Sequence, residues 1–450
     1  MMYADFEALA LEQAWLLLLF WGVGFFGLLL ATKRYTSGLL LDPFHFYYAF
    51  TYGTSYGVVA LLASSGLISW EATWIVFGLG LAFLFSFRFF SHRALVDLKP
   101  FIRSLNIPVW QYRACLLTMI VLYVVLVCIN LSVSGFGFLA ESRFESSLGY
   151  GPIIRLVEAL RLILTAWFGL KIVRRIQAKE PFVLSTMFLV FFLLFSSLLN
   201  GAKFAMLEGC YAITIAAVVA NIRLPITNFA RYLSITVFVA VISVFVLVIL
   251  SFNILSTGGD PFAQSESING IPVLIERLVG RIIWNGDMYF LSLPDDIYKD
   301  IAIDNFLVRF ASAIFGSQLV SGIVGYDSAQ LEVGRLIWLY WTPDDPVMRG
   351  PTNHFDLTGY FYFGHVGGLV FVIALAVVLS QVNRLVRFGK GNSDYSAVII
   401  SALWCKSVAM LMHPAAGFAW CIDLIAVLLL CKAFVFIMNP VAKKPITSFN

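Results

Sequence analysis

The dominant feature of the chain is a series of long apolar runs separated by short polar segments. A helix needs about 20 apolar residues to cross the ~30 Å hydrocarbon core of a membrane. We therefore expect an all-α polytopic membrane protein, without a separate soluble domain or an internal repeat. The runs predict eleven spans, at residues 12–31, 43–63, 70–90, 114–131, 153–172, 182–199, 205–221, 232–253, 357–380, 395–412 and 415–436.

Composition supports this class. Of the 450 residues, 60% are hydrophobic and only 12% are charged, and the mean hydropathy is +0.88. These values lie far outside the range of soluble globular proteins. The six cysteines stand singly, without the spacing of a metal site or a disulfide framework. We expect neither metal nor cofactor.

The distribution of Lys and Arg predicts the orientation. Cytoplasmic loops of membrane proteins are enriched in these residues. If the acidic N-terminus lies outside the membrane, alternate connections between the spans hold 19 of the 30 Lys and Arg residues and become the inner loops. The C-terminus then lies in the cytoplasm, as an odd number of spans requires.

One connection is much longer than the others. It divides the chain into residues 1–253 with eight spans, an outer segment at 254–356, and residues 357–450 with three spans and a tail. So long a segment without structure would be unusual in a compact fold. Apolar spacing predicts short helices at 271–284 and 305–320. A twelfth span at 305–325 is the alternative, but it breaks the charge pattern, and we favour an interfacial or reentrant helix.

The span at 153–172 contains Arg155, Glu158 and Arg161 on one helix face. Three charges cost roughly 7–10 kcal/mol on insertion scales, whereas about a dozen apolar side chains contribute only ~4–7 kcal/mol. This face is therefore predicted to meet the bundle interior or a cavity. The surplus positive charge suits an anionic ligand. The alternative is an ion pair with Glu158 that only holds helices together.

Further basic residues lie in or near the outer segment. Arg277 and Arg281 are spaced i, i+4 and share a helix face that suits phosphate oxygens, or simply a solvated surface. Arg335 and Arg349 flank the end of the segment and extend the same predicted patch. Lys203 lies near an outer span end, where snorkelling explains it equally well. Lys406 lies inside a span, with Asp423 as a candidate structural partner.

The segment GPTNHFDLTGYFYFGHVGG, residues 350–368, carries the candidate chemistry. His354 is a candidate general base near neutral pH, or an ordinary interfacial polar residue. Asp356 is the nearby acid, Tyr360 belongs to the aromatic walls, and the glycines suit close helix packing. No motif for nucleotide or nucleic-acid binding is present. A cationic outer cavity with a candidate base predicts a site for a lipid-linked anionic sugar.

The same segment, with about eleven spans and one large outer loop, resembles the O-antigen polymerases of the Wzy family. The resemblance implies a fold similar to the metal-independent glycosyltransferases of the C superfamily. It implies a protein of the bacterial inner membrane, with a periplasmic N-terminus, a large periplasmic loop and a cytoplasmic C-terminus. The implied activity is transfer of a growing glycan from undecaprenyl pyrophosphate to another lipid-linked repeat unit. A chain-length regulator and membrane lipid are candidate partners, and nucleic acid is not.

The family motifs in which glycine follows arginine after ten residues are absent, so site assignments cannot be transferred. By chemistry, His354 or Asp356 is expected to orient or deprotonate the acceptor hydroxyl. The candidate residues for binding the substrate are Arg155, Arg161, Lys203, Arg277, Arg281, Arg335, Arg349 and Tyr360. Among these, the arginines of the outer segment are expected to hold pyrophosphate.

Two other functions fit the same features. An O-antigen ligase shares the architecture and the donor, but delivers the glycan to lipid A-core. A transporter for lipid-linked oligosaccharides or other anionic substrates is expected to show repeat symmetry and broken helices near the midplane. No such symmetry is visible in the sequence, and a purely structural membrane protein would not need so many outer arginines.

Overall fold

The structure is a computed structural model. It describes residues 2–39, 41–135, 150–200, 204–222, 247–248, 250–251, 254–255, 259–264, 272–389, 391 and 393–442. These residues are predominantly helical and form no β-strand. The expected all-α class is therefore confirmed for the described part of the chain.

Six helices in the described ranges are long and apolar enough to cross a membrane. By the length and composition of these helices, the chain is a helical membrane protein. The six are α2 (Ala14–Thr32), α4 (Trp70–His92), α6 (Val109–Ser134), α17 (Phe355–Phe388), α18 (Asp394–Val408) with its short continuation, and α19 (Pro414–Ala442).

Four other predicted spans also coincide with helices. By length and composition alone, these helices do not qualify as spans, because each is either too short or too highly charged. The predicted span at 232–253 lies almost wholly outside the described residues, so the number of eleven spans stays a prediction. The four helical segments are the π-helix η1 (His45–Thr51) with α3 (Tyr52–Ser64), α8 (Gly151–Gln177), α9 (Val183–Asn200) and α10 (Phe204–Val219).

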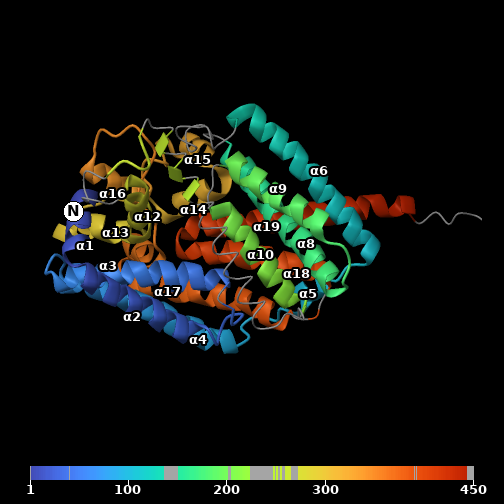
Figure 1. The fold of residues 1–450 in the computed structure, drawn as a ribbon, viewed down its shortest axis with the longest axis horizontal. Helices are drawn as coiled ribbons and strands as arrows, with labels where there is room; N and C mark the ends of the chain where they lie inside the picture. The colour runs from blue at the N-terminus through green and yellow to red at the C-terminus, as the bar shows by residue number, and fades with distance from the viewer. Residues whose placement is uncertain are drawn as a thin grey trace, which may run out of the picture.

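The long helices form two groups that share one buried core (Figure 1). In the first group α2 packs along α3, and α17 packs along α4. In the second group α10 lies against both α8 and α18, and α19 contacts α6, α8 and α18. A short helix, α5 (Lys99–Leu105), lies at the end of the second group against α18.

Among the short helices of the predicted outer segment, α12, α13 and α16 lie at one end of the molecule near the N-terminal helix α1 (Tyr3–Glu12), whereas α14 and α15 lie nearer its middle, with α14 packed against α19 (Figure 1). Gly316 separates α14 from α15 with φ +96° and ψ 138°. The ten-residue α14 is roughly 15 Å long, about half of a bilayer core. Neither helix can cross a membrane alone, which argues against the twelfth span. The helices are α12 (Val273–Ile283), α13 (Asp287–Ser292), α14 (Phe306–Phe315), α15 (Ser317–Val324) and α16 (Val333–Trp341).

The helix α17 bends sharply at Gly364, where φ is +65° and ψ is −162°. Gly359 and Gly368 would lie roughly 13.5 Å apart in a straight helix. Here a Cβ atom on Gly368 would lie 3.1 Å from the carbonyl carbon of Gly359. The close packing expected of these glycines is therefore present. The first turns of α17 form a separate short helix before residues 365–388 continue.

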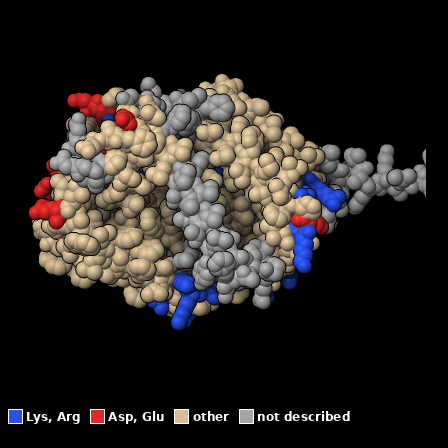
Figure 2. Space-filling model, viewed as in Figure 1, with Lys and Arg blue, Asp and Glu red and all other residues tan. Residues whose placement is uncertain are grey.

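Charged side chains are unevenly distributed on the face shown in Figure 2. Lys and Arg lie along the lower edge and toward the right end, whereas most of the visible Asp and Glu lie at the left end, near α1 and α16, with a smaller acidic patch among the basic side chains at the right. Exposed basic residues of the predicted inner loops include Lys33, Arg93, Lys99, Arg103 and Arg174. The separation is the kind that membrane proteins show between their cytoplasmic and outer ends.

Candidate functional site

The two candidate catalytic residues are linked by a tyrosine from another helix. The hydroxyl of Tyr289, in α13, lies 2.9 and 2.8 Å from the two carboxylate oxygens of Asp356, in the first turn of α17. The same hydroxyl lies 3.1 Å from Nδ1 of His354. The sequence singled out His354 and Asp356 but missed Tyr289. We call these three residues the Asp356 cluster.

Tyrosines from α3 and η1 enclose the Asp356 cluster. The hydroxyl of Tyr56 lies 3.5 Å from Oδ2 of Asp356. The hydroxyl of Tyr52 accepts the backbone N–H of Phe355 at 3.0 Å, and its ring centroid lies 4.9 Å from that of His354. Tyr48, Tyr52 and Tyr56 are four residues apart, which places them on one helical face. That spacing was a signal the sequence offered for them.

His354 and Asp356 are completely buried in this structure. A buried carboxylate is costly unless it is hydrogen-bonded, and Asp356 also accepts the backbone N–H of Leu357 at 2.8 Å. Burial lowers the pKa of His354 to about 3, although the backbone of Asn285 opposes this shift. A neutral imidazole with so low a pKa is a weak base. His354 is therefore better suited to orienting Tyr289 than to accepting a proton.

The arginines of α12 lie on an exposed face and are close in sequence to Tyr289 of the Asp356 cluster. Arg277 and Arg281 are both exposed. After α12 the chain passes directly into α13 and is attached to α3, because Ser55 donates to the carbonyl of Asn285 at 2.8 Å. The exposed basic face and Tyr289 thus belong to consecutive helices, both held against α3.

Arg335 and Arg349 do not extend this basic face as expected. Arg335 is buried and donates to the carbonyl of Val347 at 2.7 Å, to Gln330 at 3.1 Å and to the carbonyl of Asp345. Arg349 pairs with the carboxylate of Asp345 at 2.6 Å and lies 5.0 Å from the ring of Trp338. Arg335 therefore holds the loop after α16, and only the half-exposed Arg349 still faces solvent.

Arg155 and Arg161 belong to a balanced group of buried charges. Arg161 pairs with Glu158 and with Glu208 of α10, and Lys406 lies 2.7 Å from Glu208. Arg155 pairs with Asp423 of α19 at 2.8 Å. We call these six residues the buried charge cluster.

The expected surplus of positive charge on α8 is therefore wrong for the folded bundle. Three cations meet three acids in the described helices, because Glu208 and Asp423 come from other helices. The suggested pairing of Lys406 with Asp423 is also replaced, since Lys406 bonds to Glu208 and Asp423 pairs with Arg155. This arrangement corresponds to the alternative in which ion pairs hold helices together.

Of the two other candidates, one cannot be placed and the other contacts aromatic rings. Lys203 lies outside the described residues. Tyr360 is half-buried, and its ring meets Tyr298 edge-on at 5.6 Å and His365 at 5.0 Å. Its role in substrate contact stays a prediction.

A second polar group, centred on Glu332, holds the polypeptide just before His354. Glu332 lies 3.0 Å from Arg309, 2.7 Å from Nε2 of His413 and 2.9 Å from the side-chain amide of Asn353. Asn353 in turn accepts the N–H of Gly334 at 2.8 Å. Burial alone would raise the pKa of Glu332, but Arg309 and His413 outweigh it and hold the pKa at about 2. The sequence did not identify this group.

No family model, no curated protein and no solved structure matches this chain. The resemblance to the polymerases therefore depends on the segment at 350–368 and on the pattern of helices.

Proposed function

We propose that the protein is an O-antigen polymerase, a glycosyltransferase that joins lipid-linked repeat units at the periplasmic face of the bacterial inner membrane. The observation that carries the proposal is the Asp356 cluster. Asp356 and His354, which belong to the segment that resembles the family, both lie within hydrogen-bonding distance of the Tyr289 hydroxyl. The exposed arginine face of α12 lies on the adjoining helix.

The proposed reaction is a displacement at the anomeric carbon of the growing glycan. A hydroxyl on the non-reducing sugar of a second lipid-linked unit attacks this carbon. The bond to pyrophosphate breaks, and its electron pair leaves with undecaprenyl pyrophosphate. The hydroxyl proton passes to the carboxylate of Asp356, which acts as general base.

Arg277 and Arg281 supply the positive charge that the leaving pyrophosphate needs. Because Asp356 is completely buried, substrate contact requires a movement of the short helices at this end. The first turns of α17 are the natural moving part, since they are joined to the rest of the helix at Gly364.

The proposal includes eleven spans, a fold similar to the C-superfamily glycosyltransferases, a periplasmic N-terminus and a cytoplasmic C-terminus. The separation of charge in Figure 2 supports this orientation, because the basic side chains gather away from the end that contains α1 and α16. A chain-length regulator remains the proposed protein partner.

The test uses the purified protein and one synthetic undecaprenyl-pyrophosphate-linked repeat unit, without nucleotide or added metal. We expect a ladder of polymer on a gel and release of undecaprenyl pyrophosphate. Transfer that appears only when lipid A-core is added would make the protein a ligase instead. A folded protein that gives neither product, but moves the lipid-linked sugar across proteoliposomes, would overturn the proposal in favour of transport.

A further inference from the structure

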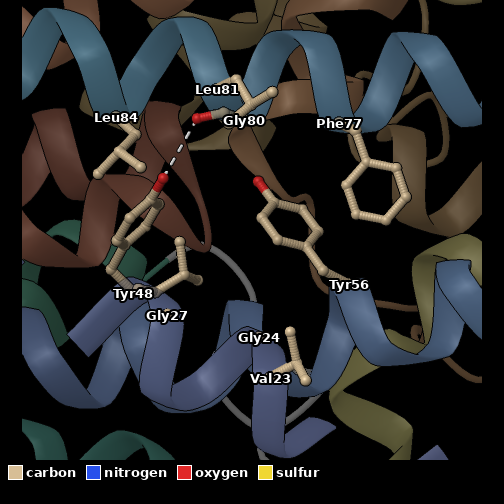
Figure 3. A pocket seen from close by; sticks show the side chains of 10 residues that line it. Val23, Gly24, Gly27, Tyr48, Tyr56, Phe77, Gly80, Leu81 and Leu84 are labelled. Carbon is tan, nitrogen blue, oxygen red and sulfur yellow. Dashed lines mark hydrogen bonds between the residues drawn. The ribbon is translucent and has the colours of Figure 1, made fainter. Parts of the chain in front are cut away.

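An apolar cavity of about 200 Å³ lies between three helices of the first group (Figure 3). Its inner wall is formed by two tyrosine rings, and the remaining lining is aliphatic, aromatic or glycine. The lining residues are Val23, Gly24, Gly27, Leu28, Tyr48, Tyr56, Phe77, Gly80, Leu81 and Leu84. They come from α2, η1, α3 and α4.

The mouth of the cavity faces outward from two helices of membrane-spanning length. Val23 is 66% exposed and Leu81 is 48% exposed. Trp15, Leu18, Leu19, Phe26 and Leu30 of α2 are likewise exposed, as expected of a helix in contact with lipid. In a membrane, the medium at this mouth is hydrocarbon.

A close backbone approach and a tyrosine hydrogen bond border the cavity. A Cβ atom on Gly24 would lie 2.9 Å from the carbonyl oxygen of Gly53, so α2 and α3 already touch there. One turn later, a Cβ on Gly27 would meet no described atom within 4 Å. The hydroxyl of Tyr48 donates to the carbonyl of Gly80 at 3.2 Å and fixes the inner wall against α4 (Figure 3).

The inner end of the cavity is one side chain away from the Asp356 cluster. The ring of Tyr56 lines the cavity, and its hydroxyl lies 3.5 Å from the Asp356 carboxylate. A chain seated in the cavity is therefore held beside the proposed catalytic group.

We infer that this cavity binds a segment of the isoprenoid chain of the polyprenyl-linked substrate. Apolar cavities of roughly 150 Å³ stay dry and accept small apolar ligands. The site admits one hydrocarbon chain and offers no polar partner at its mouth. The identity of this lipid rests on the proposed function, whereas binding of an apolar chain rests on the cavity alone.

The test measures binding of undecaprenyl pyrophosphate to the full-length protein in nanodiscs of phosphatidylcholine and phosphatidylglycerol, by native mass spectrometry. The Gly27→Phe variant fills the cavity. Its matched control, Gly22→Phe, makes the same change on the same helix. A Cβ atom on Gly22 also meets no described atom within 4 Å, but Gly22 does not line the cavity. We expect about tenfold weaker retention in Gly27→Phe and no change in Gly22→Phe.

A second pair of variants covers the case in which Gly27→Phe fails to fold. Leu81→Trp narrows the mouth, and Leu30→Trp alters an exposed position outside the lining. Equal retention in Leu81→Trp and Leu30→Trp would overturn the inference and leave only surrounding bulk lipid at this face. If Leu81→Trp weakened the retention of phosphatidylglycerol as much as that of undecaprenyl pyrophosphate, the choice of an isoprenoid chain would be overturned. Because binding requires no sugar, a missing polymer ladder with intact binding would count against the proposed function alone.

Discussion

At the residue scale, the position of His354 depends on a side chain 22 residues earlier. Glu332 bonds to Asn353 at 2.9 Å and to His413 at 2.7 Å, and pairs with Arg309 at 3.0 Å. The N–H of Gly334 completes the connection through Asn353. The Glu332 group therefore ties α16 and the start of α19 to the residue before the Asp356 cluster.

The Glu332 carboxylate makes the stability of the protein dependent on pH. Its pKa is lowered from 4.5 to about 2, so its contribution is complete above pH 4.5 and disappears as the pH falls toward 2. We expect Glu332→Gln to lower the free energy of unfolding by roughly 2–3 kcal/mol at pH 7. The difference from wild type should shrink between pH 4.5 and 2. Thermal unfolding in detergent, with the exposed Glu12→Gln as control, measures it; a difference independent of pH would contradict the assignment.

The sequence predicted His354 and Asp356 because they stand in one short segment. It did not predict Tyr289, which comes from a position 67 residues earlier than Asp356. Nor did it predict that both residues are completely buried. A single sequence shows which residue types are present, but contacts between distant segments arise only when helices pack.

At the element scale, the bend in α17 depends on one glycine. Gly364 has φ +65° and ψ −162°, a backbone conformation that is essentially restricted to glycine. Gly359 and Gly368 then pack backbone to backbone. The bend separates the first turns of α17, which carry Asp356, from the rest of the helix.

We expect Gly364→Ala to lower the free energy of unfolding by about 1–3 kcal/mol, because the backbone of an alanine is strained at this positive φ. The control Gly78→Ala lies in α4, where a Cβ meets no described atom within 4 Å. That substitution should be neutral or stabilising by up to ~1 kcal/mol. Both are measured as shifts in thermal unfolding. An unchanged Gly364→Ala would show that the bend is not a feature of the folded protein.

The buried charge cluster joins α8, α10, α18 and α19. Removing one charge by Lys406→Met leaves Glu208 and Glu158 with one fewer buried partner, so we expect a loss of roughly 3–5 kcal/mol. Arg174→Met breaks an ion pair whose side chains are 45% and 37% exposed, and should cost less than about 1 kcal/mol. Equal effects of the two variants on unfolding in detergent would refute a structural role for the cluster.

The positions of helices were largely predictable, because membrane spans are long and apolar. Every predicted span except that at 232–253 coincides with a described helix. The bend at Gly364 and the π-helix η1 were not predictable from hydropathy. The charge balance of α8 was also missed, since counting charges along one helix ignores acids on its neighbours.

At the scale of the whole molecule, the separation of charge predicts which end faces the cytoplasm. Asp97 and Asp300 are both exposed acids, Asp97 beside basic residues that precede α5 and Asp300 in the predicted outer segment. We expect a membrane-impermeant maleimide to label Asp300→Cys, but not Asp97→Cys, in cells with an intact inner membrane and a permeabilised outer one. Wild type serves as control for the native cysteines. Labelling of Asp97→Cys alone would reverse the orientation.

The most direct test of the account is polymer formation by Asp356→Asn. This change keeps the shape of the side chain and its hydrogen bond from Tyr289, but removes the carboxylate charge. With undecaprenyl-pyrophosphate-linked repeat units, we expect the rate to fall by about 10²–10⁴, while the exposed control Asp300→Asn gives the wild-type ladder. A wild-type ladder from Asp356→Asn would contradict the placement of the catalytic group in the Asp356 cluster.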